Sequence, residues 1–297
     1  MELRQLKYFL KAKELLNFTE ASKELYITQS TLSQQIKQLE EEIGQPLFDR
    51  IGKRVTLTEA GKLFATYAQK SISAANDGML LLKDLRGLEV GVLRIGLTWG
   101  LKSIVLSSLK LFTQSYPKVK IEVTFGTTTE LIQHTLKQEI DFALTFFEGE
   151  HREALNYRPL MTSDMALMVS ESSHLASLES VKLIEVAKMR LALPVKGFST
   201  RDFLDSQFNL HNITPNILVE VNQTSTVIDL VKIGAFETIL TLATVHGESH
   251  IKAIPIKGVD IRREAVIITL KESYQKRAVE VFVNLLMEED KNTYNQL

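Results

Sequence analysis

A short segment near the N-terminus carries polar side chains of the types that recognise base pairs. Ser30, Gln34 and Lys37 recur at helical spacing, so on a helix they would share one face. Gln can make two hydrogen bonds to an adenine edge, Ser can bond either kind of base, and Lys can bond guanine or phosphate. On a lone helix such a face is more often simply solvated, so the neighbouring elements must decide. The candidate base-contacting residues are Gln29, Ser30, Thr31, Ser33, Gln34 and Lys37.

The helix that would position these residues is defined at both ends. Thr28 is a good N-cap, and Ile27 before it can pack on Leu32 as a hydrophobic staple. Gly44 stops the helix, and an upstream helix opens at Asn17 with a capping pattern and ends just before Thr28. Two short helices joined by a tight turn predict a helix-turn-helix. Its second helix has one apolar stripe, which consists of Leu32, Ile36, Leu39 and Ile43.

A cluster of positive charges follows this pair of helices. Arg50, Lys53 and Arg54 surround a glycine turn, and the apolar strand 55–57 follows directly. This arrangement predicts a β-wing whose cations contact phosphate or the minor groove beside a helix in the major groove. We therefore expect the wing to position the protein on double-stranded DNA and the helix to select the sequence.

The same residues resemble the LysR-type transcriptional regulators in an ordered, ungapped pattern. The similarity of individual residues is strong through about the first sixty-five residues. In the rest of the chain the similarity is one of overall organisation. One departure is Ser22, where the family usually has a second alanine, and a buried Ser can bond its own helix carbonyl there. The matching residues are Leu3, Leu6, Phe9, Phe18, Thr19, Ala21, Leu25, Gln29, Ser33, Ile36, Leu39, Glu40, Ile43, Gly44, Leu47, Phe48, Arg50, Val55, Leu57, Thr58, Glu59, Ala60 and Gly61.

This resemblance implies an α/β protein with three parts. They are a winged helix-turn-helix, a long dimerising linker helix, and a two-lobed α/β effector-binding domain of the periplasmic-binding-protein type. We expect a homodimer or homotetramer that binds a pseudo-palindromic DNA operator. The expected boundaries are 1–58 for the DNA-binding domain, 59–87 for the linker helix and 88–297 for the effector-binding domain, with lobe one at 90–160 and 268–297 and lobe two at 164–262.

The expected linker helix has an apolar seam with alternating steps of four and three residues. Such a seam suits a partner helix, and its small residues allow close approach. Packing against its own domain is the alternative. The seam consists of Ala60, Phe64, Tyr67, Ser71, Ala74, Gly78, Leu81 and Leu85.

After residue 88 short apolar runs alternate with helical stretches, which predicts β/α units around a largely parallel sheet. We place the two crossovers between the lobes near 160–163 and 262–267. Ligands of such sheets bind in the crevice beyond the carboxyl ends of the strands. The runs predicted as strands are 90–97, 119–125, 142–145, 165–169, 191–195, 217–221, 238–242 and 265–270.

Hydroxyl side chains gather where these strands should end and helices begin. Helix N-termini offer free N–H groups and a partial positive charge, which favour an anion. Any one threonine is more often only an N-cap, but several at one cleft predict a pocket for a small anion or carboxylate. The candidate effector-binding residues are Thr98, Trp99, Gly100, Thr127, Thr128, Ser199, Thr200, Arg201, Asn222 and Thr224.

Two of these residues have two interpretations each. Arg201 could pair with the ligand or brace the loop around it, and both alternatives stay open. Trp99 could cover the pocket or pack against the first lobe, and packing is the favoured role. The segment 197–201 is similar to the branch of the family whose pockets are lined by Thr and Ser and accept small anions.

The composition of the chain and the motifs that it lacks limit the classes of protein and of site that are possible. The 297 residues carry a net charge of −1 and no cysteine, so any basic surface is local and thiolate chemistry is impossible. No export signal or long apolar run is present, so we expect a cytoplasmic protein with no membrane partner. Gly247 and Ser249 lie between His246 and His250, which indicates a loop rather than a metal site.

The sequence has no nucleophile elbow, phosphate loop or zinc-protease motif. We therefore expect no enzyme activity and no cofactor. The favoured function is a transcription regulator controlled by a small anionic effector, with RNA polymerase as a further partner. The alternative is a solute-binding protein or small-molecule enzyme whose N-terminal helices do not bind DNA.

Overall fold

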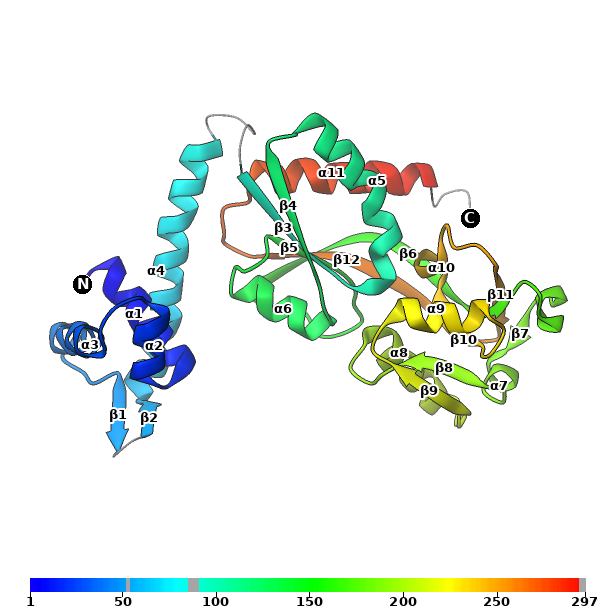
Figure 1. Cartoon of the computed structure of the whole chain (residues 1–297), viewed down its shortest axis with the longest axis horizontal. Coiled ribbons are helices and arrows are strands. Elements are labelled where there is room, and N and C mark those ends of the chain that lie inside the picture. The colour runs from blue at the N-terminus through cyan, green and yellow to red at the C-terminus, as the bar shows by residue number, and fades with distance from the viewer. Residues whose placement is uncertain (52–53, 85–90, 294–297) are drawn as a thin grey trace. The chain divides into compact units, whose positions relative to one another are not determined.

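The structure is a computed structural model that describes residues 1–51, 54–84 and 91–293 (Figure 1). The chain divides into two units, Met1–Leu85 and Arg86–Leu297, which are described one after the other. Lys53 of the predicted wing and Leu85 of the predicted seam lie outside the described residues.

Helices dominate the N-terminal unit. The predicted helix-turn-helix consists of α2 and α3, and the predicted wing is the antiparallel pair of β1 and β2. Phe9 packs edge to face against Phe48 and Phe64, with ring centroids 5.5 and 5.3 Å apart. In chain order the elements are α1 (Leu3–Leu15), α2 (Phe18–Glu24), α3 (Gln29–Ile43), β1 (Phe48–Ile51), β2 (Arg54–Leu57) and α4 (Glu59–Asp84).

Local hydrogen bonds fix both ends of α3. Thr28 Oγ1 accepts the backbone N–H three residues on at 3.1 Å, and Gly44 ends the helix with a φ of 74°. Asn17 caps α2 in the same way. These caps confirm the predicted bounds of both helices. Ser22 is buried and donates to the carbonyl of Thr19 at 2.8 Å, which confirms how the fold tolerates this departure.

The junction between the wing and α4 is packed backbone to backbone. Thr58 Oγ1 donates to the carbonyl of Pro46 at 2.7 Å and accepts the N–H of Gly61 at 2.9 Å. The carbonyl of Leu47 accepts the N–H of Thr58 at 3.1 Å. A Cβ at Gly61 would lie 2.1 Å from the Leu47 carbonyl oxygen. Glycine is therefore required at this position by close approach.

We expect Gly61→Ala to destabilise the N-terminal unit by at least about 1 kcal/mol, because the new methyl must displace backbone. Gly91→Ala is the matched control, because Gly91 lies in the C-terminal unit, outside the predicted seam, and an added Cβ there meets nothing within 4 Å. In a strand Ala is favoured over Gly by about 0.5–1 kcal/mol, so this control should be neutral or more stable. Thermal unfolding measures both, and equal melting temperatures would contradict this interpretation of the junction.

Helix α4 uses one stripe to pack on its own unit. Ala65, Ala68 and Ile72 are buried in that core, and Phe64 is partly buried against it. The helical spacing of the apolar residues did not distinguish this buried stripe from the predicted seam. Residues of α4 outside the predicted seam make most of this packing, and most of the seam is not covered by its own unit. The exposed seam residues are Tyr67, Ser71, Ala74, Gly78 and Leu81.

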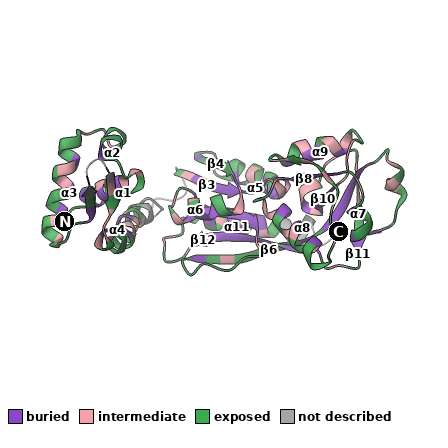
Figure 2. Cartoon of the chain, turned by 90° about the horizontal axis from the view of Figure 1, so that it is seen from below, coloured by how far each residue is buried: buried purple, intermediate pink, exposed green. Residues whose placement is uncertain are grey.

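The C-terminal unit has two lobes joined by two long strands, β6 (Leu155–Ser170) and β12 (Arg262–Leu270), which are largely buried (Figure 2). Lobe one also contains β3 (Gly91–Leu97), α5 (Lys102–Ser115), β4 (Val119–Phe125), α6 (Thr128–Leu136), β5 (Phe142–Phe146) and α11 (Arg277–Thr293). Lobe two contains β7 (Val181–Lys182), α7 (Leu183–Val186), β8 (Leu191–Pro194), α8 (Ser199–Leu210), β9 (Ile217–Val221), α9 (Thr224–Lys232), β10 (Thr238–Thr241), α10 (Leu242–Val245) and β11 (Ile251–Lys257).

The main sheet is mixed, so the prediction of a largely parallel sheet was wrong. Strand β3 is parallel to β4 and β5, but β12 is antiparallel to β5 and β6, and β6 is antiparallel to β10 and β11. The reason is that β6 leaves lobe one while β12 returns to it, and the two run side by side. Strand β11 was missed because lysines interrupt its apolar residues.

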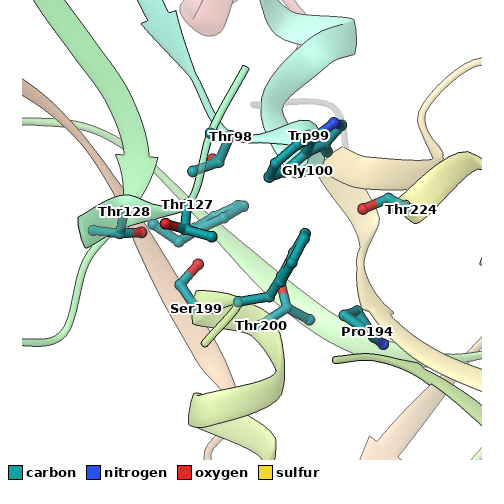
Figure 3. Close-up of a pocket in the computed structure, with 12 residues that line it drawn as sticks. Thr98, Trp99, Gly100, Thr127, Thr128, Pro194, Ser199, Thr200 and Thr224 are labelled. Atoms are coloured by element: carbon teal, nitrogen blue, oxygen red, sulfur yellow. The ribbon is translucent and has the colours of Figure 1, made fainter. Parts of the chain in front are cut away.

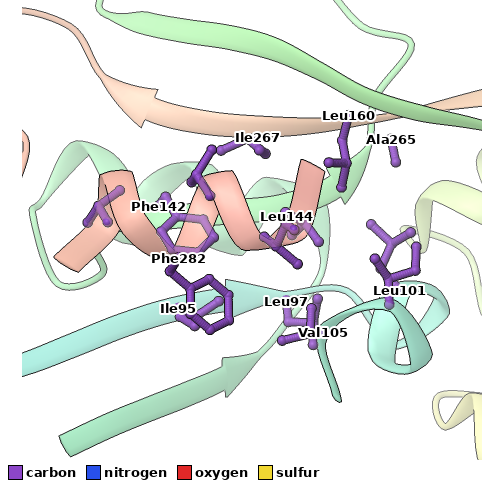
Figure 4. Close-up of a cluster of buried hydrophobic side chains, with 14 of the residues drawn as sticks. Ile95, Leu97, Leu101, Val105, Phe142, Leu144, Leu160, Ala265, Ile267 and Phe282 are labelled. Carbon is purple, nitrogen blue, oxygen red and sulfur yellow. The ribbon is translucent and has the colours of Figure 1, made fainter. Parts of the chain in front are cut away.

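Each lobe has its own hydrophobic core, and this core holds in place the strands whose ends carry the loops. In lobe one Phe112, Phe142 and Phe282 come from α5, β5 and α11 and lie in one buried cluster, in which Figure 4 shows Phe142 and Phe282. In lobe two Leu193 of β8 and Phe208 of α8 belong to a separate buried cluster.

Candidate functional site

One face of α3 is buried and the opposite face carries the predicted polar residues. Leu32, Ile36 and Leu39 are fully buried. The side chain of Gln34 makes no hydrogen bond within the described residues, so its donors and its acceptor are available. Of the candidates, Ser33 is half-buried, and the exposed ones are Gln29, Ser30, Thr31, Gln34 and Lys37.

The polar residues at the start of α3 are held by its N-cap. Thr28 Oγ1 lies 2.9 Å from the hydroxyl of Ser30 and 2.8 Å from that of Thr31. Further along, Lys37 Nζ lies 3.6 Å from a carboxylate oxygen of Glu41. Exposed pairs of this kind are weak, so the ammonium group of Lys37 can exchange this partner for a phosphate or a base.

The wing places its arginines next to the turn of the hairpin. In the β1–β2 pair Arg50 lies opposite Val55, and Ile51 lies opposite Arg54. Lys53, the third predicted cation, is not among the described residues. The register therefore puts Arg50 and Arg54 at the end of the hairpin that is farthest from α4.

The turn before α3 adds a residue that the sequence interpretation missed. Tyr26 is 95% exposed and has a φ of 55°, a left-handed conformation that is uncommon for an aromatic residue. It lies two residues before the N-cap of α3, where a phenol hydroxyl could donate to phosphate. The signal available in the sequence was an aromatic residue in the turn of a helix-turn-helix.

A small pocket lies between the two lobes, where strands end and helices begin (Figure 3). Lobe one contributes the end of β3 and the start of α6, and lobe two contributes the starts of α8 and α9. Its volume is about 20 Å³, which is room for one water molecule. The lining residues are Thr98, Trp99, Gly100, Gly126, Thr127, Thr128, Phe146, Pro194, Phe198, Ser199, Thr200 and Thr224.

Two of the predicted effector-binding residues, Arg201 and Asn222, do not line the pocket. Asn222 is exposed after β9. Arg201 is buried and donates to Asp205 at 2.8 Å, to the carbonyl of Pro194 at 3.0 Å, and to Glu220. Burial lowers the pKa of Arg201, but the hydrogen bonds to both carboxylates outweigh it and hold the pKa above its ordinary value. Of the two alternatives, this geometry favours bracing of the loop before α8.

The hydroxyl protons on the lobe-one side of the pocket are already used. Thr98 donates to a strand carbonyl at 3.4 Å, and Thr127 donates to Glu130 at 2.9 Å. Thr145 donates to a backbone carbonyl at 3.0 Å, so Thr128, 2.6 Å away, must donate to Thr145. The hydrogen bonds from the backbone N–H and side chain of Thr127 lower the pKa of Glu130. The predicted capping box at α6 is therefore confirmed, and its Glu130 is held as a carboxylate.

The hydroxyl groups on the lobe-two side of the pocket still have protons to donate. Within the described chain, the hydroxyls of Ser199 and Thr224 have no hydrogen-bond partner. Thr200 Oγ1 accepts a hydrogen bond from Arg263 at 3.1 Å, which leaves its proton available. A ligand in this pocket therefore meets hydroxyl donors from lobe two, together with the free N–H groups at the starts of α6, α8 and α9.

Trp99 contacts aromatic rings of both lobes. Its ring stacks on Phe198 of lobe two at 4.9 Å between centroids, and it lies 6.2 Å from Phe125 of lobe one. Trp99 also lines the pocket. It therefore packs between the lobes as well as bordering the pocket, which joins the two predicted alternatives.

Comparison with known proteins gives the family. A family profile described as the LysR substrate binding domain matches residues 86–291, and one described as the bacterial regulatory helix-turn-helix protein, lysR family, matches residues 3–62. The chain belongs to the LysR family of transcriptional regulators. LysR regulators bind DNA and form oligomers, and this membership makes the chain a transcription factor rather than an enzyme.

Two relatives from Bacillus subtilis illustrate how far the similarity extends. The HTH-type transcriptional regulator BsdA is 26% identical over 290 residues, which cover 96% of this chain and 100% of the relative. The uncharacterized HTH-type transcriptional regulator YwqM is 34% identical over 220 residues, which cover 73% of this chain and 75% of the relative.

Solved LysR-family structures share the architecture. A full-length OxyR variant from Pseudomonas aeruginosa is similar with a TM-score of 0.73 and 20% identity, and the match covers 96% of this chain and 94% of that one. Full-length CbnR in complex with its target DNA is similar with a TM-score of 0.61 and 26% identity, over 97% of this chain and 100% of that one.

None of the described helices has the length and apolar character that a membrane span requires. In the same residues no three His, Asp or Glu side chains come together in a way that could hold a metal ion.

Proposed function

We propose that this LysR-family regulator binds a pseudo-palindromic operator and that a small anionic effector between its lobes controls the output. The observation that carries this proposal is the convergence of uncommitted hydroxyl donors and helix N-termini on one pocket. Among the residues that the structure describes, no acceptor takes the hydroxyl proton of Ser199, Thr200 or Thr224. Each of the three lies in the first turn of α8 or α9.

The residues that line the pocket favour a small ligand that accepts hydrogen bonds. Among the described residues, the polar side chains that line the pocket are hydroxyls and the indole of Trp99, and none of them is charged. The charge of an anion would therefore be balanced by N–H groups and helix dipoles. The volume of about 20 Å³ is smaller than such a ligand, so we include separation of the lobes before the ligand enters as part of the proposal. An effector that binds one lobe arrangement better than the other would shift the population toward it.

On the DNA side, the proposal assigns base contacts to the exposed face of α3 and phosphate contacts to the wing. Arg50, Lys53 and Arg54 would position the protein, and Gln34 would select bases. The exposed seam of α4 supports a dimer, and two dimers would give a tetramer. We include RNA polymerase as a further partner because a change in operator bending would alter its access.

The proposed effector class is tested by a screen of small anions. We expect sulfate, nitrate, phosphate, acetate or a small dicarboxylate to raise the melting temperature of the full chain, because a ligand at 100 times its Kd adds about 2.7 kcal/mol of stability. Thr224→Val keeps the side-chain volume and should weaken the hit. Thr113→Val in α5 is the matched control, since the Thr113 hydroxyl bonds its own helix. A screen without any hit would overturn the anionic effector.

A further inference from the structure

A fully buried arginine lies beside the pocket without lining it. The side chain of Arg263 on β12 has an exposed fraction of 0%, and it pairs with both carboxylate oxygens of Glu148 at 2.6 and 2.8 Å. Its guanidinium also lies over the rings of Phe146 and Phe203, at 4.7 and 5.2 Å from their centroids. A buried cation persists only when it is paired and hydrogen-bonded, so this position is built for an arginine.

The contacts of Arg263 come from both lobes. Phe146 ends β5, and Glu148 follows it, so both belong to lobe one. Thr200 and Phe203 lie on α8 of lobe two. Arg263 itself lies at the start of a strand that connects the lobes, opposite Ser163 of β6. One side chain therefore links the two sides of the pocket at the crossover.

The hydrogen bond to Thr200 has a direction that matters for the pocket. Arg263 Nη1 donates to Thr200 Oγ1 at 3.1 Å, and a guanidinium has no acceptor, so Thr200 can only accept from it. The single proton of the Thr200 hydroxyl then remains for a different acceptor. Since Thr200 lines the pocket, that acceptor can be the ligand.

We propose that Arg263 is a positioning residue of the effector pocket, which ties Thr200 of lobe two to Glu148 of lobe one and fixes the Thr200 hydroxyl as a donor to an anionic ligand. This inference rests on the proposed effector pocket. It adds the residue through which the pocket is assembled from two lobes. It also gives a reason for selectivity, because a donor fixed in this way selects ligands that accept hydrogen bonds.

The first test needs no ligand, because Trp99 is the one tryptophan of the chain and stacks on Phe198 across the lobes. We expect Arg263→Met to shift the Trp99 emission to longer wavelength and to increase its quenching by acrylamide, because the lobes separate more often. Met keeps an apolar contact with both phenylalanines. Arg262→Met is the matched control, since Arg262 is exposed and pairs with Asp260 at 3.6 Å, and it should leave the emission unchanged.

The second test measures sulfate binding by calorimetry in the full chain. Thr200→Val and Arg263→Met should each raise the sulfate Kd by about tenfold or more, the usual worth of a hydrogen bond to a charged group. Thr200→Ser keeps the hydroxyl and should restore binding. If Arg263 acts through Thr200, the double variant should bind sulfate no more weakly than Thr200→Val alone.

The outcomes separate the two proposals. An unchanged Trp99 emission and quenching in Arg263→Met, or effects on Kd that multiply in the double variant, would overturn the role of Arg263. If Arg263→Met fails to fold, the comparison of Thr200→Val with Thr200→Ser decides by the same emission and quenching. Failure of the wild type to bind sulfate or any other screened anion counts against the anionic effector, while the Trp99 measurement still decides the link between the lobes.

Discussion

Replacing Gln34 with glutamate is expected to weaken operator binding by at least about 100-fold, because a like charge placed against DNA costs several kcal/mol. Gln34 lies on the exposed face of α3, and its amide has no partner within the described residues. The carboxylate of Gln34→Glu has the same size and keeps the helix intact, so the loss would come from the contact with DNA. Binding is measured by gel shift on operator fragments selected from genomic DNA by the wild type.

The control for this variant is Gln114→Glu, which makes the same chemical change on an exposed position of α5 in the other unit. It should leave operator binding unchanged. Gln34→Ala adds a second readout, since it should relax base preference at one operator position at a cost of about 1–3 kcal/mol. Unchanged affinity in Gln34→Glu together with unchanged preference in Gln34→Ala would mean that α3 does not read the groove.

Phe282→Ala is expected to destabilise the C-terminal unit by about 3–5 kcal/mol, the usual cost of truncating a buried phenylalanine. Phe282 on α11 is fully buried. Its ring lies 5.5 Å from that of Phe112 on α5 and 6.0 Å from that of Phe142 on β5. Truncation removes the ring through which α11 contacts α5 and β5, and Figure 4 shows Phe282 together with Phe142.

Denaturant unfolding of the full chain measures this loss. Leu106→Ala on α5 is the matched control, because Leu106 is 54% exposed and surface changes usually stay within about 0.5 kcal/mol. A loss below about 1 kcal/mol in Phe282→Ala would contradict the packing of α11 into lobe one.

The DNA-binding helices were predictable because their signals are local. The N-cap at Thr28, the stop at Gly44 and the apolar stripe of Leu32, Ile36 and Leu39 each involve residues within a few positions of one another. A capping hydrogen bond or a helical period is complete within one or two turns. The sequence by itself therefore determined α2, α3, their bounds and the face that carries Gln34.

The hydroxyl residues of the pocket were predictable for a related reason. Strand ends and helix starts leave local signatures, and in this fold such ends meet at one edge. Thr98, Thr127 and Ser199 were found in this way. Which of these hydroxyls still holds a free proton depends on partners elsewhere in the chain, as with Thr145 for Thr128. That part was decided by the tertiary structure.

Contacts between residues far apart in the sequence decided the partners of the buried arginines, the strand directions and the packing of α4. Arg201 and Arg263 are both buried arginines, but Arg201 is satisfied by Asp205 and Glu220 of its own lobe, while Arg263 joins Glu148 to Thr200 across 115 and 63 positions of sequence. The Arg201–Asp205 pair has the local i,i+4 spacing of one helix. No local pattern predicts the partners of Arg263, because that side chain meets them only after the crossing strands have brought them together. The same physical reason made the sheet mixed and chose the buried stripe of α4, since strand direction and helix packing are set by the assembled fold rather than by neighbouring residues.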